Sequence, residues 1–238
     1  MTLELAVCAV AALALVLLGL TGPAYRIGLL SVAQALTLLQ WIAYVAAAAL
    51  AAGLLVGFLA YRRGARMRMV VAAAAVLGGV AATVIPLETI RRHQSAPPIH
   101  DLTTDLENPP TFEAIPPLRG DRSNSLERSR AMSDEQRRSY PDLAPMTLPL
   151  PPDRAFARAL TRAQEAEWTL VTADRGSGRI EATDTTRWFG FTDDIVVRLT
   201  PWGSGTRVDV RVSARQGESD GGRNARRIRR YLGALQAR

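Results

Sequence analysis

Residues 193–213 read DDIVVRLTPWGSGTRVDVRVS and carry the clearest structural signal in the chain. Apolar and polar residues alternate on both sides of a glycine-containing turn, which is typical of a β-hairpin with one buried face. We expect the turn at Thr200–Gly205. That turn would set Asp194 opposite Arg211 on the face away from the core. The expected pairs on the buried face are Val197 with Val208 and Ile195 with Val210.

Further elements follow on both sides of this hairpin. A helix over 153–167 has apolar residues on one face, and a second helix over 222–235 repeats that pattern. Shorter strands are expected at 146–150, 168–173 and 179–183, before the hairpin strands 194–199 and 206–213. The order is strand, helix, four strands, helix. We therefore expect an α+β domain over 146–238, an antiparallel sheet with both helices packed on its buried side.

The N-terminal part of the chain is apolar. Residues 1–90 contain seven charged side chains and residues 91–238 contain 44, which excludes a purely soluble protein. Uncharged stretches at 5–25, 27–61 and 69–87 are long enough to cross a bilayer. We expect a transmembrane region over 1–90 with spans at about 3–22, 38–60 and 69–88. Residues 27–36 would lie at the interface or extend a tilted helix, and Pro86 would end the third span.

Arginine marks the orientation of these spans, since the chain contains no lysine. The short loop Arg62–Arg68 holds four arginines, whereas the other connection holds only Arg26, so the loop is expected in the cytoplasm. The interpretation is a multi-pass protein of the bacterial inner membrane with a cytoplasmic N-terminus and a periplasmic C-terminal domain. A cleaved signal peptide is the alternative for the first span, but Glu4 and the lack of an early arginine make a poor leader.

Residues 91–145 are rich in proline and should form an extended linker strapped to the domain. One short helix is expected near Ser133–Ser139, with Ser133 and Gln136 as its capping box. Residues 120–130 look disordered. His100, with Asp101 and Asp105 beside it, is expected to anchor the linker to the domain. These side chains could instead bind a metal, but a closed zinc site needs about four ligands, so no metal is predicted.

Several segments together resemble a known family. They are IHDLTTD at 99–105, PPTF at 109–112, DDIVVR at 193–198, RVDVR at 207–211 and SDGGRNARRI at 219–228. They resemble the family catalogued as domain of unknown function 1499, over about residues 99–235. Family members tend to have Ser where this chain has Val212. The resemblance implies a protein of bacterial envelopes or plastids, often behind membrane spans, and implies no particular reaction.

One polar cluster is a candidate site. Its members are Asp194, Arg198, Asp209, Arg211 and Arg215 on the hairpin and Asn224 and Arg227 on the last helix. It is either a pocket in which arginine binds an anionic headgroup or carboxylate, or an ion-pair network that holds sheet and helix together. We favour the network. Asp193 and Asp194 are adjacent on a strand, so they should point to opposite faces.

No catalytic residues, metal or other cofactor are predicted. The chain has neither a nucleophile elbow nor a phosphate-binding glycine-rich loop that leads into a helix. The basic run 226–230 has few aromatic neighbours and an expected outside location, which argues against nucleic acid. We expect a non-enzymatic binding module, an accessory or scaffold component with the lipid bilayer and a membrane protein as partners. The alternative is an envelope hydrolase or lipid- or anion-binding protein that uses the polar cluster.

Overall fold

The computed structural model describes residues 2–237, which divide into two compact units. The first contains the described residues up to Gln94 together with Arg187–Gly190. The second contains Ser95–Thr186 and the described residues from Phe191 onward, so the proline-rich stretch is part of it.

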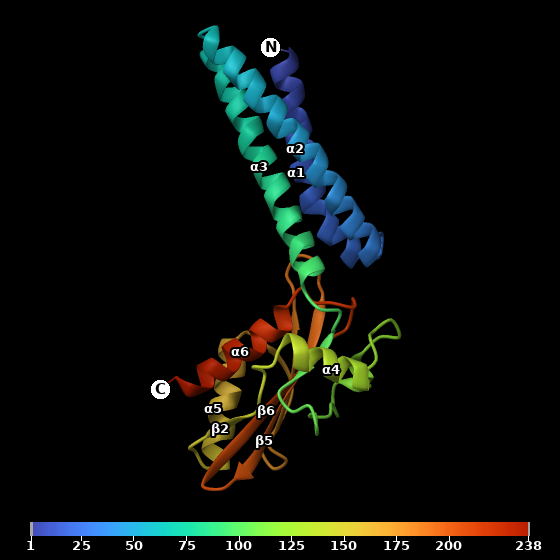
Figure 1. Ribbon diagram of the computed structural model, residues 1–238, viewed down its shortest axis with the longest axis vertical. Helices are drawn as coiled ribbons and strands as arrows, with labels where there is room; N and C mark the ends of the chain where they lie inside the picture. The colour runs from blue at the N-terminus through green and yellow to red at the C-terminus, as the bar shows by residue number, and fades with distance from the viewer. Residues whose placement is uncertain (1, 238) are drawn as a thin grey trace. The chain divides into compact units, whose positions relative to one another are not determined.

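The first unit consists mainly of long apolar helices. They are α1 (Thr2–Arg26), α2 (Val32–Arg62) and α3 (Arg66–Ser95), which run side by side in Figure 1. All three are long and apolar enough to cross a membrane. Small residues lie where the helices meet: a Cβ atom added at Gly79 would lie 3.0 Å from the Leu50 Cβ atom, and Ala46 and Ala75 are buried. Such residues let helix backbones approach closely.

Two helix limits differ from expectation. Ser31 caps α2 and Gln34 completes the capping box, so residues 32–36 form the first part of that helix and start it six residues before the expected span, whereas residues 27–31 connect it to α1. Helix α3 continues through Pro86 to Ser95, so the expectation that Pro86 ends it was wrong. Proline removes one backbone donor and displaces one carbonyl, and the rest of a long helix can tolerate this loss.

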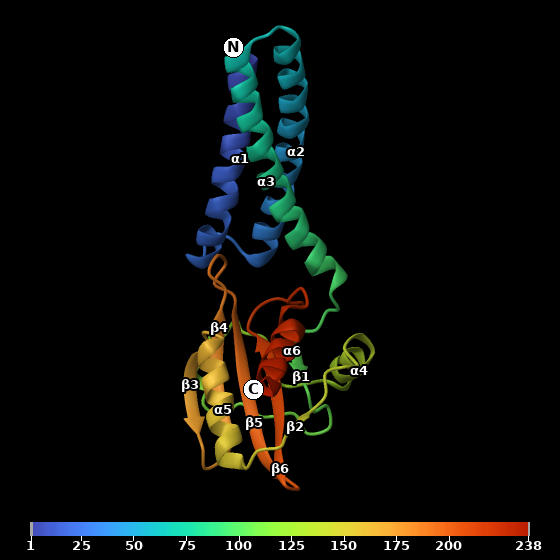
Figure 2. The same cartoon turned by 90° about the vertical axis from the view of Figure 1, so that its left-hand side faces the viewer.

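The second unit is an α+β sandwich, as predicted. Within the described residues, one antiparallel sheet runs in the order β1-β6-β5-β4-β3, and β2 also pairs with β6. The strands are β1 (Asp101–Thr103), β2 (Met146–Leu148), β3 (Thr169–Asp174), β4 (Arg179–Thr185), β5 (Thr192–Trp202) and β6 (Gly205–Ala214). Figure 2 shows α5 (Pro152–Glu165) and α6 (Arg223–Gln236) together across one face of this sheet.

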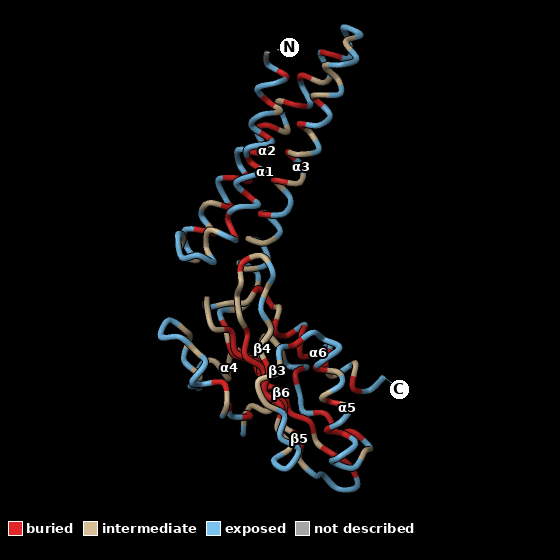
Figure 3. Tube along the Cα trace, turned by 180° about the vertical axis from the view of Figure 1, so that it is seen from behind, coloured by how far each residue is buried: buried red, intermediate tan, exposed pale blue. Residues whose placement is uncertain are grey.

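The main core lies between the sheet and these two helices. Alternate residues of β5 and β6 face it, and apolar residues at helical spacing on α5 and α6 close it. Figure 3 shows buried segments concentrated along β4, β5 and β6. The central members are Ile195, Val197, Leu199, Val208, Val210, Val212, Phe156, Ala159, Ile228 and Leu235.

The register of the hairpin differs from expectation. The turn consists of Gly203 and Ser204 alone, because β5 continues as far as Trp202, which pairs with Gly205. Gly203 has φ +57°, the left-handed conformation that tight hairpin turns favour. The true pairs are Val197 with Val210, Ile195 with Val212 and Asp194 with Ser213. The expected partners were therefore wrong by two residues, although a shift of two leaves every side chain on its predicted face.

Residues 101–128, which we call the strap, cover the second face of the sheet. Strand β1 pairs with β6, and Phe112 and Ile115 pack on Val196. A 3-10 helix at Pro116–Leu118 follows. The segment 120–130 is not the disordered stretch that composition suggested, because the Asn124 side chain donates to the Ala214 and Gly217 carbonyls at 3.0 and 2.8 Å.

The helix after the strap, α4 (Arg130–Ser139), begins three residues earlier than expected. Its N-cap is Ser129, whose hydroxyl accepts from the Met132 backbone N–H at 3.1 Å, and Ser133 lies inside the helix. A serine cap satisfies one of the amide donors that a helix start leaves unpaired.

Replacing Ser129 by Ala is therefore expected to destabilise α4 by about 1 kcal/mol. Ser133→Ala is the matched control and should change the stability of α4 by less than about 0.5 kcal/mol, because Ser133 is not the cap. Amide hydrogen exchange over α4 measures both. Equal effects of the two substitutions would contradict the assignment of the cap.

Candidate functional site

The seven residues of the predicted polar cluster lie on two different faces of the sheet. Those on the strap face are Asp194, Arg198, Asp209, Arg211 and Arg215, whereas Asn224 and Arg227 lie on α6 on the helix face. Asp193 and Asp194 point to opposite faces, as expected: Asp193 binds arginines of α6, and Asp194 binds Arg215 and an arginine of the strap. The cluster is therefore divided into a strap-face set and a helix-face set of ion pairs, which we call the two networks.

On the strap face, Arg211 connects β6 to the strap. Its Nε and Nη2 atoms donate to the Asp101 carboxylate at 3.0 and 2.9 Å, and Arg128 donates to the same carboxylate. Arg211 also donates to the Pro110 and Leu126 carbonyls and lies over the Phe112 ring. Asp101 is 1% exposed and Arg211 is 5% exposed, so this pair is removed from water.

Asp194 neutralises a second pair of arginines. Arg215 donates to both of its oxygens, with Nε and Nη2 at 3.0 and 2.8 Å from Oδ1, and Arg119 of the strap binds Oδ2. Burial lowers the pKa of the Arg119 guanidinium, with the positive Arg215 adding to this, and the negative Asp194 only partly offsets the effect. Asp194 is thus a structural counter-ion for strap and strand.

A third group joins the strap to the turn end of the hairpin. Arg198 Nη2 lies 3.1 Å from Asp105 Oδ2 and 3.0 Å from Asp209 Oδ2. Arg207 reaches the same two carboxylates, at 2.7 and 3.1 Å. Charges of opposite sign therefore alternate across the strands and the strap, so each neutralises its neighbours.

Glu181 on β4 also holds the strap and was not identified from the sequence. Its fully buried carboxylate accepts the backbone N–H groups of Glu113, Ala114 and Ile115 at 2.7, 3.0 and 2.9 Å. A glutamate between apolar residues of a strand is usually exposed to solvent, so only the strap above it shows its role.

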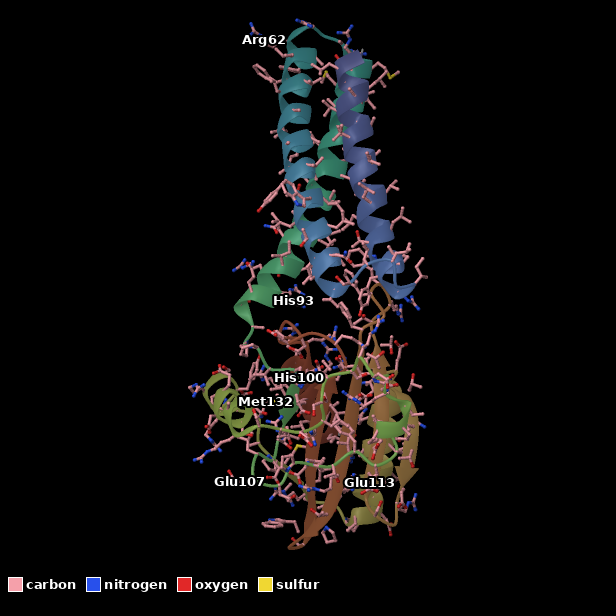
Figure 4. The ribbon with its side chains drawn as sticks, turned by 90° about the vertical axis from the view of Figure 1, so that its right-hand side faces the viewer. Arg62, His93, His100, Glu107, Glu113 and Met132 are labelled. Atoms are coloured by element: carbon pink, nitrogen blue, oxygen red, sulfur yellow. The ribbon has the colours of Figure 1, made fainter. Side chains whose placement is uncertain are left out.

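The predicted anchors of the linker have different roles. Asp101 and Asp105 bind arginines of β5 and β6, as described above. The His100 side chain is 3.4 Å from the Ser125 carbonyl, within the same stretch of chain, and its backbone carbonyl accepts from the Ala214 N–H (Figure 4). Among residues 2–237, no group of three or more His, Cys, Asp or Glu side chains is placed to hold a metal ion.

On the helix face, Asp193 connects β5 to α6. Arg223 donates to both of its oxygens, and Arg227 Nη1 donates to Oδ2 at 2.8 Å. Arg227 also binds Asp184 on β4 and the side-chain oxygen of Asn224. Burial tends to lower the pKa of the Arg227 guanidinium, but Asp193 and Asp184 outweigh burial and raise that pKa above its ordinary value.

The start of α6 is closed by another carboxylate. Asp220 accepts the backbone N–H groups of Gly222, at 2.8 Å, and Asn224. Burial raises the pKa of Asp220, and the nearby Asp193 adds to this effect. The backbone N–H groups of Gly222, Arg223 and Asn224 are thus already bound by Asp220, which leaves this helix start poorly suited to bind an anion.

One pocket of about 480 Å³ opens beside α6, at the end of α5 and the start of β3. Trp168 and Tyr231, whose rings stack with centroids 4.6 Å apart, contribute to its wall. Its charged lining residues are Arg162, Glu165, Glu167, Asp184, Arg223, Arg226, Arg227 and Arg230. We call it the arginine pocket.

Sequence reasoning identified only part of this pocket. It named Arg227 as a cluster member and noted the basic run 226–230, but it did not identify the aromatic wall. The signal was the spacing of arginines along α6, where 223, 227 and 230 recur every three or four residues and so share one side of the helix. Which neighbours complete the pocket depends on how α5 and β3 pack against that side.

Comparison with protein-family models gives a match to the family described as protein of unknown function (DUF1499), over residues 101–235. The matched region begins at Asp101 in the strap and extends through nearly all of α6, so it includes both ion-pair networks and the arginine pocket. A search of curated proteins finds no match. Since the family model covers more than half of the chain, the protein belongs to the DUF1499 family, as its sequence motifs suggested.

Proposed function

We propose that the protein is a multi-pass component of the bacterial inner membrane that presents its second unit in the periplasm as a non-enzymatic binding module. In this proposal it serves as an accessory or scaffold subunit of a larger membrane complex. The observation that carries the proposal is that the carboxylates of the predicted cluster are already bound by arginines of the same chain.

A hydrolase that used this cluster would need a carboxylate free to accept or donate a proton near a substrate. Asp101 in the strap, and Asp194 and Asp209 beneath it, are instead buried, each with two arginine partners. Breaking such pairs to admit a substrate would leave uncompensated buried charges. The arrangement therefore supports a structural role for the networks and a binding role for the outer surface.

The orientation is supported by the distribution of arginine between the helices. Arg62 lies at the end of α2, where the chain turns toward α3 (Figure 4), and Arg63, Arg66 and Arg68 follow within six residues. The connection between α1 and α2, residues 27–31, contains no charged side chain. Short arginine-rich loops are retained on the cytoplasmic side of a membrane.

Alkaline phosphatase fused after the last residue should therefore be active, whereas a fluorescent protein that folds only in the cytoplasm should stay dark at that position. Fusions at the α2–α3 turn should behave in the opposite way. Neutralising the arginines of that turn is expected to reduce the difference between the two reporters, because these arginines supply the positive charge that orients α2 and α3 in the membrane. An active cytoplasmic reporter after the last residue would contradict the periplasmic placement.

The binding role is tested by photo-crosslinking in intact cells with the full chain. A photoreactive amino acid at exposed positions of the second unit, such as Gln236, should yield a reproducible adduct with one membrane protein. The same probe at Met67, in the first turn of α3, is the control and should not yield that adduct. Turnover of ester substrates by the purified chain, without adducts from the second unit, would favour the hydrolase instead.

A further inference from the structure

The arginine pocket has the composition of a site for an anion. We propose that it binds the phosphate group of a phosphate ester, with Arg226 and Arg230 as the principal ligands. This inference rests on the proposed binding role of the second unit and gives that unit a ligand class.

The charges of the pocket do not cancel. Its lining contains five arginines and three carboxylates, and the buried Asp193, which binds two of these arginines, adds a fourth carboxylate, so one positive charge is in excess. Arg227 is fully used by Asp193, Asp184 and Asn224, Arg223 by Asp193, and Arg162 pairs with Glu165 at 2.6 Å. The charged lining residues outside these pairs are Arg226, Arg230 and Glu167, so the excess positive charge lies on the two arginines.

Arg226 and Arg230 keep their donors available. Both are exposed, and Arg226 makes one hydrogen bond, from Nη2 to the Gly221 carbonyl at 3.2 Å. For Arg230, the described part of the chain offers neither an ion pair nor a hydrogen bond to the side chain. They stand four residues apart on α6, where two like charges repel each other. A bound anion would relieve that repulsion.

A phosphate group fits this arrangement better than a carboxylate. Guanidinium forks bind both groups, but a carboxylate is satisfied by one bidentate fork. A phosphate monoester presents three acceptor oxygens and between one and two negative charges at neutral pH, so it can bind two arginines at once. The charge of such a group also matches the excess in the pocket.

The pocket can receive more than the phosphate. Ala166, Ala234, Trp168 and Tyr231 supply apolar and aromatic wall beside the arginines. The organic part of an ester would contact that wall. Such an ester is either a free phosphorylated small molecule or a phospholipid whose headgroup is itself a phosphate monoester, as in phosphatidic acid, and both present the same terminal phosphate group.

The test uses the full chain in nanodiscs and follows modification of individual arginines by phenylglyoxal, a reagent that attacks free guanidinium groups. Peptide mass spectrometry reports each site. In phosphatidylcholine nanodiscs, Arg226 and Arg230 should react readily, and inorganic phosphate should slow their reaction in a saturable way. Arg154, exposed on α5 and outside the pocket, is the matched control and should react equally with and without phosphate.

A second arm distinguishes the two sources of phosphate. Nanodiscs that also contain phosphatidic acid, whose headgroup is a phosphate monoester, should protect Arg226 and Arg230 without added phosphate if the ligand is a lipid headgroup. If only dissolved phosphate protects, the ligand is a free phosphate ester. Either result supports the inference. Absence of selective protection in both arms overturns it.

Variants separate binding from folding. Arg230→Gln breaks no hydrogen bond found in the structure, so the protein should fold normally, yet bind phosphate at least about tenfold more weakly, the loss that one charge-assisted hydrogen bond implies. Arg226→Gln/Arg230→Gln should abolish saturable binding, and Arg154→Gln should leave it unchanged. Unaltered phosphate affinity in folded Arg230→Gln would overturn the assignment.

Failure of this inference and failure of the proposed function look different. If the photo-crosslinked partner is retained but phosphate protects neither arginine, the binding module stands and its phosphate ligand does not. If phosphate protects both arginines but no partner adduct forms, the pocket stands and the accessory role does not.

Discussion

Replacing Asp101 by Ala is expected to lower the free energy of unfolding of the second unit by about 3–5 kcal/mol, because it leaves two buried guanidinium groups without their counter-ion. Those groups belong to Arg211 and Arg128, both of which donate to the Asp101 carboxylate. The strap should also detach locally, since Asp101 lies in β1. Chemical denaturation measures the global loss, and amide hydrogen exchange over residues 99–128 measures the local one.

The partners of Asp101 make this prediction specific. Arg211→Met should cost less than Asp101→Ala, because Asp101 then keeps Arg128, and the double variant should cost less than the sum of the two. Asp121→Ala is the control: this carboxylate lies exposed in the same strap, so the change should stay within about 0.5 kcal/mol. If Asp101→Ala behaved like Asp121→Ala, buried charge pairing would not be what holds the strap.

Asp193→Ala, on the opposite face of the sheet, is expected to lower the free energy of unfolding of the second unit by a similar amount, about 3–5 kcal/mol. Asp193 is fully buried and accepts from both Arg223 and Arg227, so its removal leaves Arg227 with only the partly exposed Asp184 as a counter-ion. Hydrogen exchange should rise over α6 and remain low over the strap, because the two networks share no residue.

Asp153→Ala, at the exposed start of α5, provides the matched control for Asp193. Its negative charge near the N-terminus of α5 stabilises that helix by at most about 1 kcal/mol, so its removal should have a small effect. Increased exchange over the strap in Asp193→Ala would show that the two faces are coupled, contrary to the separation of their contacts. Stability equal to that of the control would show that α6 is held by its apolar contacts alone.

Periodicity was sufficient to place most side chains on their faces. Alternation along β5 and β6 assigned Ile195, Val197, Val208 and Val210 to the core, and all four lie there. The pairing of these residues was not predictable in the same way, because it depends on the length of the turn. Any change of two residues in that pairing preserves the alternation, so the pattern cannot distinguish the registers.

The polar cluster shows the same division. Neighbouring Asp193 and Asp194 had to face opposite ways on a strand, and that much followed from geometry alone. Their partners did not follow from it. Arg119, which binds Asp194, comes from the strap, and Arg223 and Arg227, which bind Asp193, come from α6, 30 and 34 residues further along the chain. A buried carboxylate needs a counter-ion but does not specify from where in the sequence it comes.

Composition and periodicity were thus enough to predict the apolar helices, the α+β class and the family, since each depends on patterns within a short stretch of chain. Tertiary structure alone decided the hairpin register, the burial of Glu181 beneath the strap and of Asp101 within it, and the arginine pocket. The physical reason is that charge pairing and pocket shape act between segments far apart in the sequence. Whether an arginine holds the fold or remains free for a ligand depends on which carboxylates folding brings to it.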